Sequence, residues 1–241
     1  MGDNENTPHV IPNRFAHDMG SIGKPGCRCF TPPNRLRLEF HDDVQDVEAP
    51  GWHRMLELID EAAADGRTEF APLREMSQDE QAQLVTLPPE IAKLTAVTRF
   101  VLYGSNLVRI PPEIGAMTSL EVFDPYTSYR LHWFPYEITR CTRLRDSTVS
   151  TRALYGNVKF RPPFPPTGDA PGDVTSCSVC TNPVTEPHQV WITLRVATDH
   201  LPLLVNACSA ECVAALPPPS ENYPSAPHRG GPGVRQPKPY H

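Results

Sequence analysis

Long apolar runs are missing from this chain of 241 residues. A helix needs about 18 or more consecutive apolar residues to cross a bilayer, and no such stretch occurs. The opening residues, MGDNEN, have neither the basic and apolar regions of a signal peptide nor the serine or threonine of a myristoylation motif. We therefore expect a soluble cytoplasmic protein that does not bind a membrane.

Clustered positive charge is also scarce. Lys and Arg total 22 against 28 for Asp and Glu, which gives a formal net charge of −6 at pH 7. Electrostatic attraction to DNA or to an anionic membrane needs Lys and Arg gathered on one surface, where they replace bound counterions. The composition therefore argues against nucleic acid as a partner.

The common local motifs of catalytic sites are absent as well. The sequence contains no glycine-rich phosphate-binding loop, no GxSxG nucleophile elbow and no HExxH metalloprotease motif. The histidines are scattered singly, which is typical of surface residues rather than of a proton relay. We therefore predict that the protein is not an enzyme.

What the chain does contain is one phrase written three times. Residues 87–91 read LPPEI, residues 110–114 read IPPEI and residues 134–138 read FPYEI. Their spacing, about 23 and then about 24 residues, falls in the range of leucine-rich repeats. Residues 97–111 also match the consensus LxxLxLxxNxLxxLP position by position, with Ser105 in place of the asparagine. The chain therefore resembles leucine-rich-repeat proteins of the short bacterial type.

This resemblance implies a solenoid in which each repeat adds a short strand to one sheet, with alternate residues on a concave binding face. It places on that face Arg99, Val101 and Tyr103, then Val122, Asp124 and Tyr126, then Asp146, Thr148 and Ser150. Our preferred contacts with a protein partner are Arg99, Val101, Tyr103, Asp124, Tyr126 and Thr148. Adjacent strands lie about 4.8 Å apart, so Tyr103 and Tyr126 should be neighbours on a recognition surface. The alternative is that the two rings pack on each other or under the N-terminal arm.

Two residues depart from the simple repeat pattern. Pro125 occupies an inward position and has no amide hydrogen, so the second strand should be broken or distorted there. Cys141 aligns with Leu94 and Met117, three residues after the repeated phrase, and so takes a buried apolar position. Some bacterial leucine-rich-repeat proteins carry a ubiquitin ligase with a catalytic cysteine, but a thiol buried like that of Cys141 is usually inert.

An N-terminal cap should close the first repeat, and residues 36–86 carry its signals. Alternation from Leu36 predicts a strand, and the sequence after Pro50 predicts a helix. The predicted apolar face of this helix contains Trp52, Met55, Leu56, Ile59 and Ala63. Ser77 and Glu80 form a capping-box pattern, which predicts a second, short helix that ends near Leu84.

Four cysteines predict a metal site near the C-terminal end. Cys177 and Cys180 form one close pair, and Cys208 and Cys212 form another. Zn²⁺ binds four such thiolates in a tetrahedron. The alternating residues between the pairs predict a hairpin with a turn at 198–200, and residues 209–216 predict a short helix. This order resembles a treble-clef zinc finger with a structural metal. His188 or His200 could replace a cysteine as ligand.

These signals divide the chain into six parts of an α/β protein. They are an irregular arm (1–35), a cap (36–86), repeats (87–160), a proline-rich linker (161–173), a zinc module (174–216) and a disordered proline-rich tail (217–241). Cys27 and Cys29 in the arm could hold a second metal or be two ordinary thiols.

The sequence therefore predicts a non-catalytic adaptor that binds a protein partner through the concave face, with Zn²⁺ as a structural cofactor. One alternative is a nucleic-acid-associated zinc-finger protein in which the zinc module makes the contact. Another is an enzyme of unrecognised type that uses the region of Cys27 and Cys29.

Overall fold

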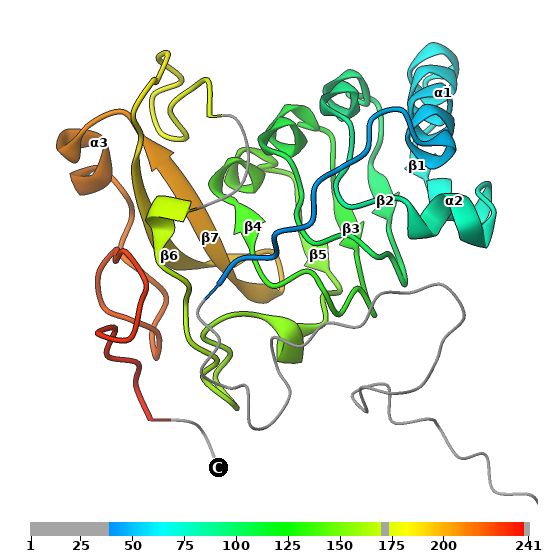
Figure 1. The fold of residues 1–241 in the computed structure, drawn as a ribbon. Helices are drawn as coiled ribbons and strands as arrows, with labels where there is room; N and C mark the ends of the chain where they lie inside the picture. Colours follow the sequence, from blue (N-terminus) through cyan, green and yellow to red (C-terminus); the bar gives the residue numbers. More distant parts are fainter. Residues whose placement is uncertain (1–38, 170–173, 239–241) are drawn as a thin grey trace, which may run out of the picture.

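The computed structural model describes residues 39–169 and 174–238, which form a mixed α/β fold (Figure 1). A short parallel sheet occupies the middle, and an antiparallel hairpin lies near a cluster of four cysteines. The predicted arm at 1–35, with Cys27 and Cys29, lies outside the described residues. Most of the strand predicted from Leu36 does too, and its described residues, Glu39 and Phe40, are not in a strand.

The parallel sheet has the strand order β1-β2-β3-β5. Its strands are β1 (Glu69–Phe70), β2 (Arg99–Val101), β3 (Val122–Asp124) and β5 (Asp146–Ser147). Arg99 pairs with Val122, and Val122 pairs with Asp146, which confirms the register that the repeated phrases predict. β3 ends directly before Pro125, because proline has no amide hydrogen to continue the ladder.

Each repeated phrase forms a 3₁₀ turn beside the sheet. The turns are η2 (Pro89–Lys93), η3 (Pro112–Ala116) and η4 (Tyr136–Arg140). Proline suits the start of η2 and η3, since the first amides of a helix have no partner within it. The isoleucine of each phrase is fully buried, and the phenylalanines of adjacent strands pack behind the sheet with ring centroids 5.5 and 5.8 Å apart. The repeated sequence thus produces a repeated core.

Two helices close the N-terminal end of the sheet, α1 (Pro50–Asp65) and α2 (Gln78–Ala82). The capping box at Ser77 and Glu80 is confirmed, with each residue bonded to the backbone amide of the other. The buried face of α1 differs from the prediction, because two of the predicted residues are replaced by two others. Leu58 and Ala62 are buried, whereas Leu56 is partly buried and Ala63 is exposed. β1, which follows α1, adds a fourth strand that the repeated phrases did not predict.

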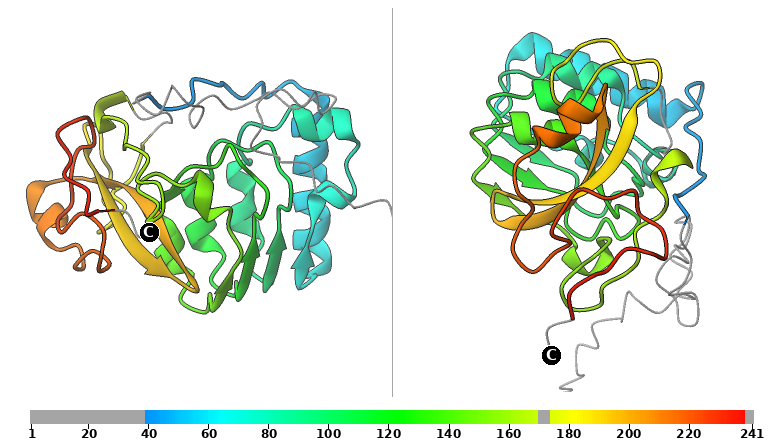
Figure 2. Two further views of the ribbon diagram at one scale, coloured as in Figure 1. Left: turned by 90° about the horizontal axis from the view of Figure 1, so that it is seen from below. Right: turned by 90° about the vertical axis from the view of Figure 1, so that its left-hand side faces the viewer.

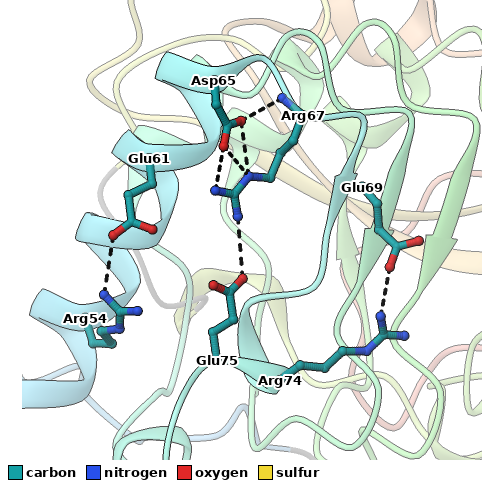
Figure 3. A network of polar contacts seen from close by, with 7 residues as sticks. All are labelled: Arg54, Glu61, Asp65, Arg67, Glu69, Arg74 and Glu75. Atoms are coloured by element: carbon teal, nitrogen blue, oxygen red, sulfur yellow. Dashed lines mark hydrogen bonds and ion pairs between the residues drawn. The ribbon is translucent and has the colours of Figure 1, made fainter.

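Charged side chains connect the end of α1 with the residue after the short turn η1 (Pro72–Arg74), and connect η1 with β1 (Figure 3). Arg67 lies 2.6 Å from Asp65 and 3.5 Å from Glu75, and Arg74 lies 2.8 Å from Glu69. These groups are largely exposed, where single ion pairs contribute only about 0–1 kcal/mol to stability. These ion pairs therefore contribute little to the stability of the fold.

A hairpin closes the other end of the sheet (Figure 2). Its strands are β6 (His188–Val196) and β7 (Asp199–Ala207), and β4 (Phe134–Pro135) pairs in parallel with β7. The turn lies at residues 197–198, slightly earlier than predicted, with Ala197 in the left-handed region at φ 52°. The short helix α3 (Ala210–Ala214) follows the hairpin. Apolar residues of the hairpin and of the repeats belong to one hydrophobic core.

The proline-rich segments pack on the hairpin, and this differs from the sequence prediction. In the predicted linker, which includes η6 (Thr167–Asp169), Phe164 is fully buried and the Pro165 carbonyl accepts a 2.9 Å bond from the Trp191 indole. Where a disordered tail was predicted, the backbone of His228 instead pairs with Trp191 in β6. The reason is that β6 is an edge strand whose amides and carbonyls need partners.

The remaining short turn, η5 (Thr151–Ala153), leads from the parallel sheet to this packed segment. Within 39–169 and 174–238, no helix combines the length and the apolar character that a membrane crossing requires.

Candidate metal centre

Four sulfur atoms gather where the N-terminal end of β6 and the C-terminal end of β7 meet α3. The Sγ atoms of Cys177, Cys180, Cys208 and Cys212 all lie within 4.8 Å of one another. Cys208 is 3.5 Å from both Cys180 and Cys212. A tetrahedral Zn²⁺ with bonds of about 2.3 Å needs sulfur atoms about 3.8 Å apart. The cluster therefore has the donor set and nearly the spacing of a four-thiolate metal site.

The first cysteine pair lies on a tight turn whose amides point at sulfur. Cys177 Sγ accepts bonds from the backbone amides of Val179, Cys180 and Cys208, at 3.3 to 3.5 Å. Burial raises the pKa of Cys177, but the amide bonds outweigh this effect and lower it to about 6. The turn is thus prepared to hold a thiolate, which is the form that binds metal.

The second pair starts a helix. Cys208 follows β7 directly, and the Ser209 side chain caps α3 by accepting a bond from the Cys212 amide. Hydrogen bonds with Cys180 and then Cys212 raise the pKa of Cys208 to about 12. Thiolates this close together repel one another unless a cation neutralises their charge. The cluster therefore favours a bound divalent metal over four ionised cysteines without a metal.

Among the described residues, the candidate metal ligands that cluster are the four cysteines. Neither of the alternative ligands, His188 and His200, belongs to the cluster. His200 instead stacks on Tyr223 of the tail, with ring centroids 5.3 Å apart. Cys177 is buried and Cys180 is exposed, so the site lies at the surface with one side in the core. Four cysteines fill a tetrahedron and leave no open position for a substrate or water.

The two predicted tyrosines lie side by side on the turns that follow β2 and β3. The ring centroids of Tyr103 and Tyr126 are 6.1 Å apart, and the two residues are 53% and 45% exposed. The two rings contact each other and still present surface to solvent, which confirms that they are neighbours. Two exposed aromatic rings on neighbouring turns form a compact aromatic patch.

The other predicted contact residues differ in exposure. Arg99 and Thr148 are exposed, and Asp124 is half-buried with a carboxylate oxygen that accepts a bond from the Tyr126 amide. Val101, the last residue of β2, is only 6% exposed, and its neighbours Phe100 and Leu102 are fully buried as well. Val101 therefore offers almost no surface to a partner. We refer to the remaining set as the tyrosine face: Arg99, Tyr103, Asp124, Tyr126 and Thr148.

Cys141 is a buried core residue, as the repeat alignment predicts. Its thiol donates a 3.2 Å bond to the Ile114 carbonyl. Burial raises the pKa of Cys141 to about 11, so the thiol is protonated at neutral pH. This environment is typical of a structural cysteine and not of a nucleophile.

One part of the site carries no signal in the sequence. The guanidinium of Arg140, on η4, donates a 2.8 Å bond to the Ser178 carbonyl and a 3.4 Å bond to the Cys177 carbonyl. Arg140 and Cys177 are separated by 37 residues. No local sequence pattern predicts a contact between residues so far apart along the chain.

Comparison of the chain with models of known protein families gives no match, and comparison with curated proteins gives none either. The four-cysteine cluster and the tyrosine face are therefore the features of the described residues that bear on function.

Proposed function

We propose that this chain is a non-catalytic adaptor that binds a protein partner through the tyrosine face and is stabilised by a structural Zn²⁺. The sheet would be a short leucine-rich-repeat array, and residues 174–216 would form a treble-clef-like module that holds the metal through Cys177, Cys180, Cys208 and Cys212. Zn²⁺ supplies no reaction here; it fixes the fold around it.

The observation that carries the binding proposal is the exposed pair Tyr103 and Tyr126. Tyrosine has few rotatable bonds and a large amphipathic ring, so it contributes contact area with little loss of entropy. The pair lies on the turns that directly follow the paired strands β2 and β3, where the Gly104 amide donates a 2.7 Å bond to the Tyr126 carbonyl. A rigid support of this kind favours recognition, because the surface needs no ordering when a partner binds.

The repeat assignment is supported by periodic features of the described residues. The three phrases form 3₁₀ turns of equal length, and the strands after the first two phrases pair in register. Ser105 and Ser128 follow β2 and β3 at equivalent positions, and their hydroxyl oxygens are 2.7 Å apart. Asparagines form a comparable ladder in the consensus that the sequence resembles.

The zinc assignment is supported by the donor set. Four thiolates at this spacing suit Zn²⁺, and the amides that bond Cys177 reduce the repulsion between sulfur charges. Within the module, Arg195 is an exposed cation on β6, and the formal charge of the whole chain is −6. These features favour a structural role of the metal in protein binding over nucleic-acid recognition.

Affinity capture from the native cell tests the binding proposal. The wild-type chain is compared with a Tyr103→Glu/Tyr126→Glu double variant, and bound protein and nucleic acid are both quantified. A matched control, Thr118→Glu/Thr142→Glu, adds the same charge at exposed residues before the strands and away from the tyrosines.

We expect a specific protein partner to be captured by the wild type and by the control but lost from the tyrosine variant. If nucleic acid is recovered instead, or the tyrosine variant captures the same partner, the face is not the binding site. Circular dichroism of all three proteins checks that the double variant is folded.

A further inference from the structure

The hairpin beside the metal cluster is built into the repeats through β4. Phe134 and Pro135 start the third repeated phrase, and they pair in parallel with Leu203 and Leu204 of β7. β7 then ends at Ala207, directly before the ligand Cys208. The last repeat and the metal cluster therefore share one strand pair.

The turn of the hairpin holds the edge of the parallel sheet. The Thr198 hydroxyl donates to the Ser147 carbonyl at 2.7 Å and accepts from the Ser147 amide at 3.1 Å. The Ser147 hydroxyl lies 2.9 Å from a carboxylate oxygen of Asp199. Ser147 belongs to β5, so these bonds satisfy the outer edge of a two-residue strand that has little stability of its own.

A second connection starts at the first cysteine pair. Ser178, between Cys177 and Cys180, exchanges backbone and hydroxyl bonds with Asn206 of β7 at 2.8 and 2.9 Å. Its carbonyl accepts the bond from Arg140 on η4. The turn that the metal fixes thus contacts both the hairpin and the last repeat.

From β5 the contacts continue to the tyrosine face. β5 pairs with β3, and the buried Ser150 hydroxyl accepts a 2.8 Å bond from the Thr127 amide. Thr127 follows Tyr126 in the chain. The loop that carries one of the two tyrosines is therefore held by the same segment that the hairpin turn holds.

We propose that metal occupancy of the four-cysteine site controls how firmly β5 and the loop after Tyr126 are held. The turn of Cys177 and Cys180 and the short helix α3 supply the two-state element, because they lie outside the strands of the hairpin and metal binding contributes folding free energy to the segments that hold the metal. When these segments loosen, Ser178 no longer fixes Asn206 and Arg140, so β7 and the Thr198 turn are held less firmly and β5 loses support from its outer partner. Metal and partner then bind cooperatively, since coupling between two sites is reciprocal. This inference rests on the zinc part of the proposed function.

Amide hydrogen exchange of the full chain tests the proposal without a partner. Exchange is measured by mass spectrometry in the zinc-loaded protein, after chelation, and after Zn²⁺ is restored. We expect chelation to accelerate exchange in residues 144–150 by about 5- to 150-fold, the range of typical coupling between sites. Residues 50–65 in α1, at the far end of the sheet, should change little. Restored Zn²⁺ should reverse the effect.

A coupling variant and a matched control make the test specific. Ser147→Ala/Thr198→Val removes the bonds at the hairpin turn but leaves the cysteines intact, so it should hold zinc and show a much smaller chelation effect in residues 144–150. Thr142→Val/Ser225→Ala makes the same chemical changes at exposed residues and should behave as the wild type.

Three results would overturn the proposal: unchanged exchange in residues 144–150 after chelation, an equal acceleration in α1, or an equal effect in the coupling variant. In each case the protein still binds zinc, so the metal site itself stands. A chain that never takes up zinc removes both the site and the coupling, which separates the two failures.

Discussion

Ser105 and Ser128 join consecutive repeats inside the protein. Both residues are buried. The Ser128 hydroxyl accepts a 3.2 Å bond from the Ser105 amide and donates a 3.2 Å bond to the Leu102 carbonyl. The Ser105 hydroxyl, 2.7 Å away, completes the group. A buried polar group of this kind stabilises the fold only while all its members are paired.

We predict that Ser128→Ala lowers the free energy of unfolding by about 1–3 kcal/mol, because the partners of the lost hydroxyl stay buried. Urea unfolding measures this loss, and Ser119→Ala at a partly exposed turn serves as the control with a change below about 0.5 kcal/mol. An equal effect of the two substitutions would mean that the serine pair does not join the repeats.

The repeat pattern predicted the two tyrosines of the tyrosine face, but it did not predict the exposure of every residue that it placed beside them. Tyr103 and Tyr126 follow from the consensus spacing and are exposed neighbours. Val101 follows from the same spacing and is nevertheless buried. A period-two pattern gives the side of the sheet on which a residue lies, but neighbouring segments decide whether that side is open.

At the scale of elements, the C-terminal segment, residues 217–238, pairs with the outer edge of β6. The backbones of Trp191 and His228 exchange bonds of 2.7 and 3.1 Å, and the Ser220 amide donates to the Thr193 carbonyl. The His228 ring lies edge-on to Phe164, with centroids 4.7 Å apart. Burial of the imidazole lowers the pKa of His228 from 6.5 to about 4.

Acid should therefore weaken the attachment of this segment. A lowered pKa in the folded state means that the unfolded chain binds the proton more readily, so stability falls as the pH drops from 6.5 towards 4. We predict that the titration of His228 lowers the free energy of unfolding by on the order of 1–3 kcal/mol over that range. The asparagine of His228→Asn does not titrate in this range. Its side-chain oxygen can accept the hydrogen bond that the Gly230 amide donates to Nδ1 of His228 in the wild type.

Urea unfolding of wild type and His228→Asn at pH 7.5 and pH 5.0 measures the difference. The wild type should lose more stability than the variant between these values. An identical pH dependence in both proteins would show that the ring of His228 does not control the attachment.

Elements with local signals were predicted well, and elements that depend on distant contacts were not. The capping box at Ser77, the hairpin and the helix after Cys208 each follow from a few adjacent residues. The packed C-terminal segment was predicted to be disordered, because proline-rich composition gives no periodic signal. Its order comes from the unpaired edge of β6 and the fully buried Trp191 beneath it, which no local window of sequence contains.

At the scale of the whole molecule, the metal cluster and the repeats belong to one hydrophobic core. Cys177 and Ile192 from the cysteine module share this core with Phe134 and Ile138 from the third repeat. The four clustered cysteines were predictable from their spacing in the sequence. The contacts that attach them to the repeats, through Arg140 and Ser147, were not, because they join segments about 40 to 50 residues apart.

Zinc content of the purified full chain is the most direct test of the metal-stabilised account. Native mass spectrometry should find one Zn²⁺ per chain in the wild type and in Cys141→Ser, whose thiol lies in the repeat core. Cys180→Ser and Cys208→Ser should lose the metal, since each removes one of the four clustered ligands. A zinc-free wild type, or zinc unchanged in both ligand variants, would contradict the account.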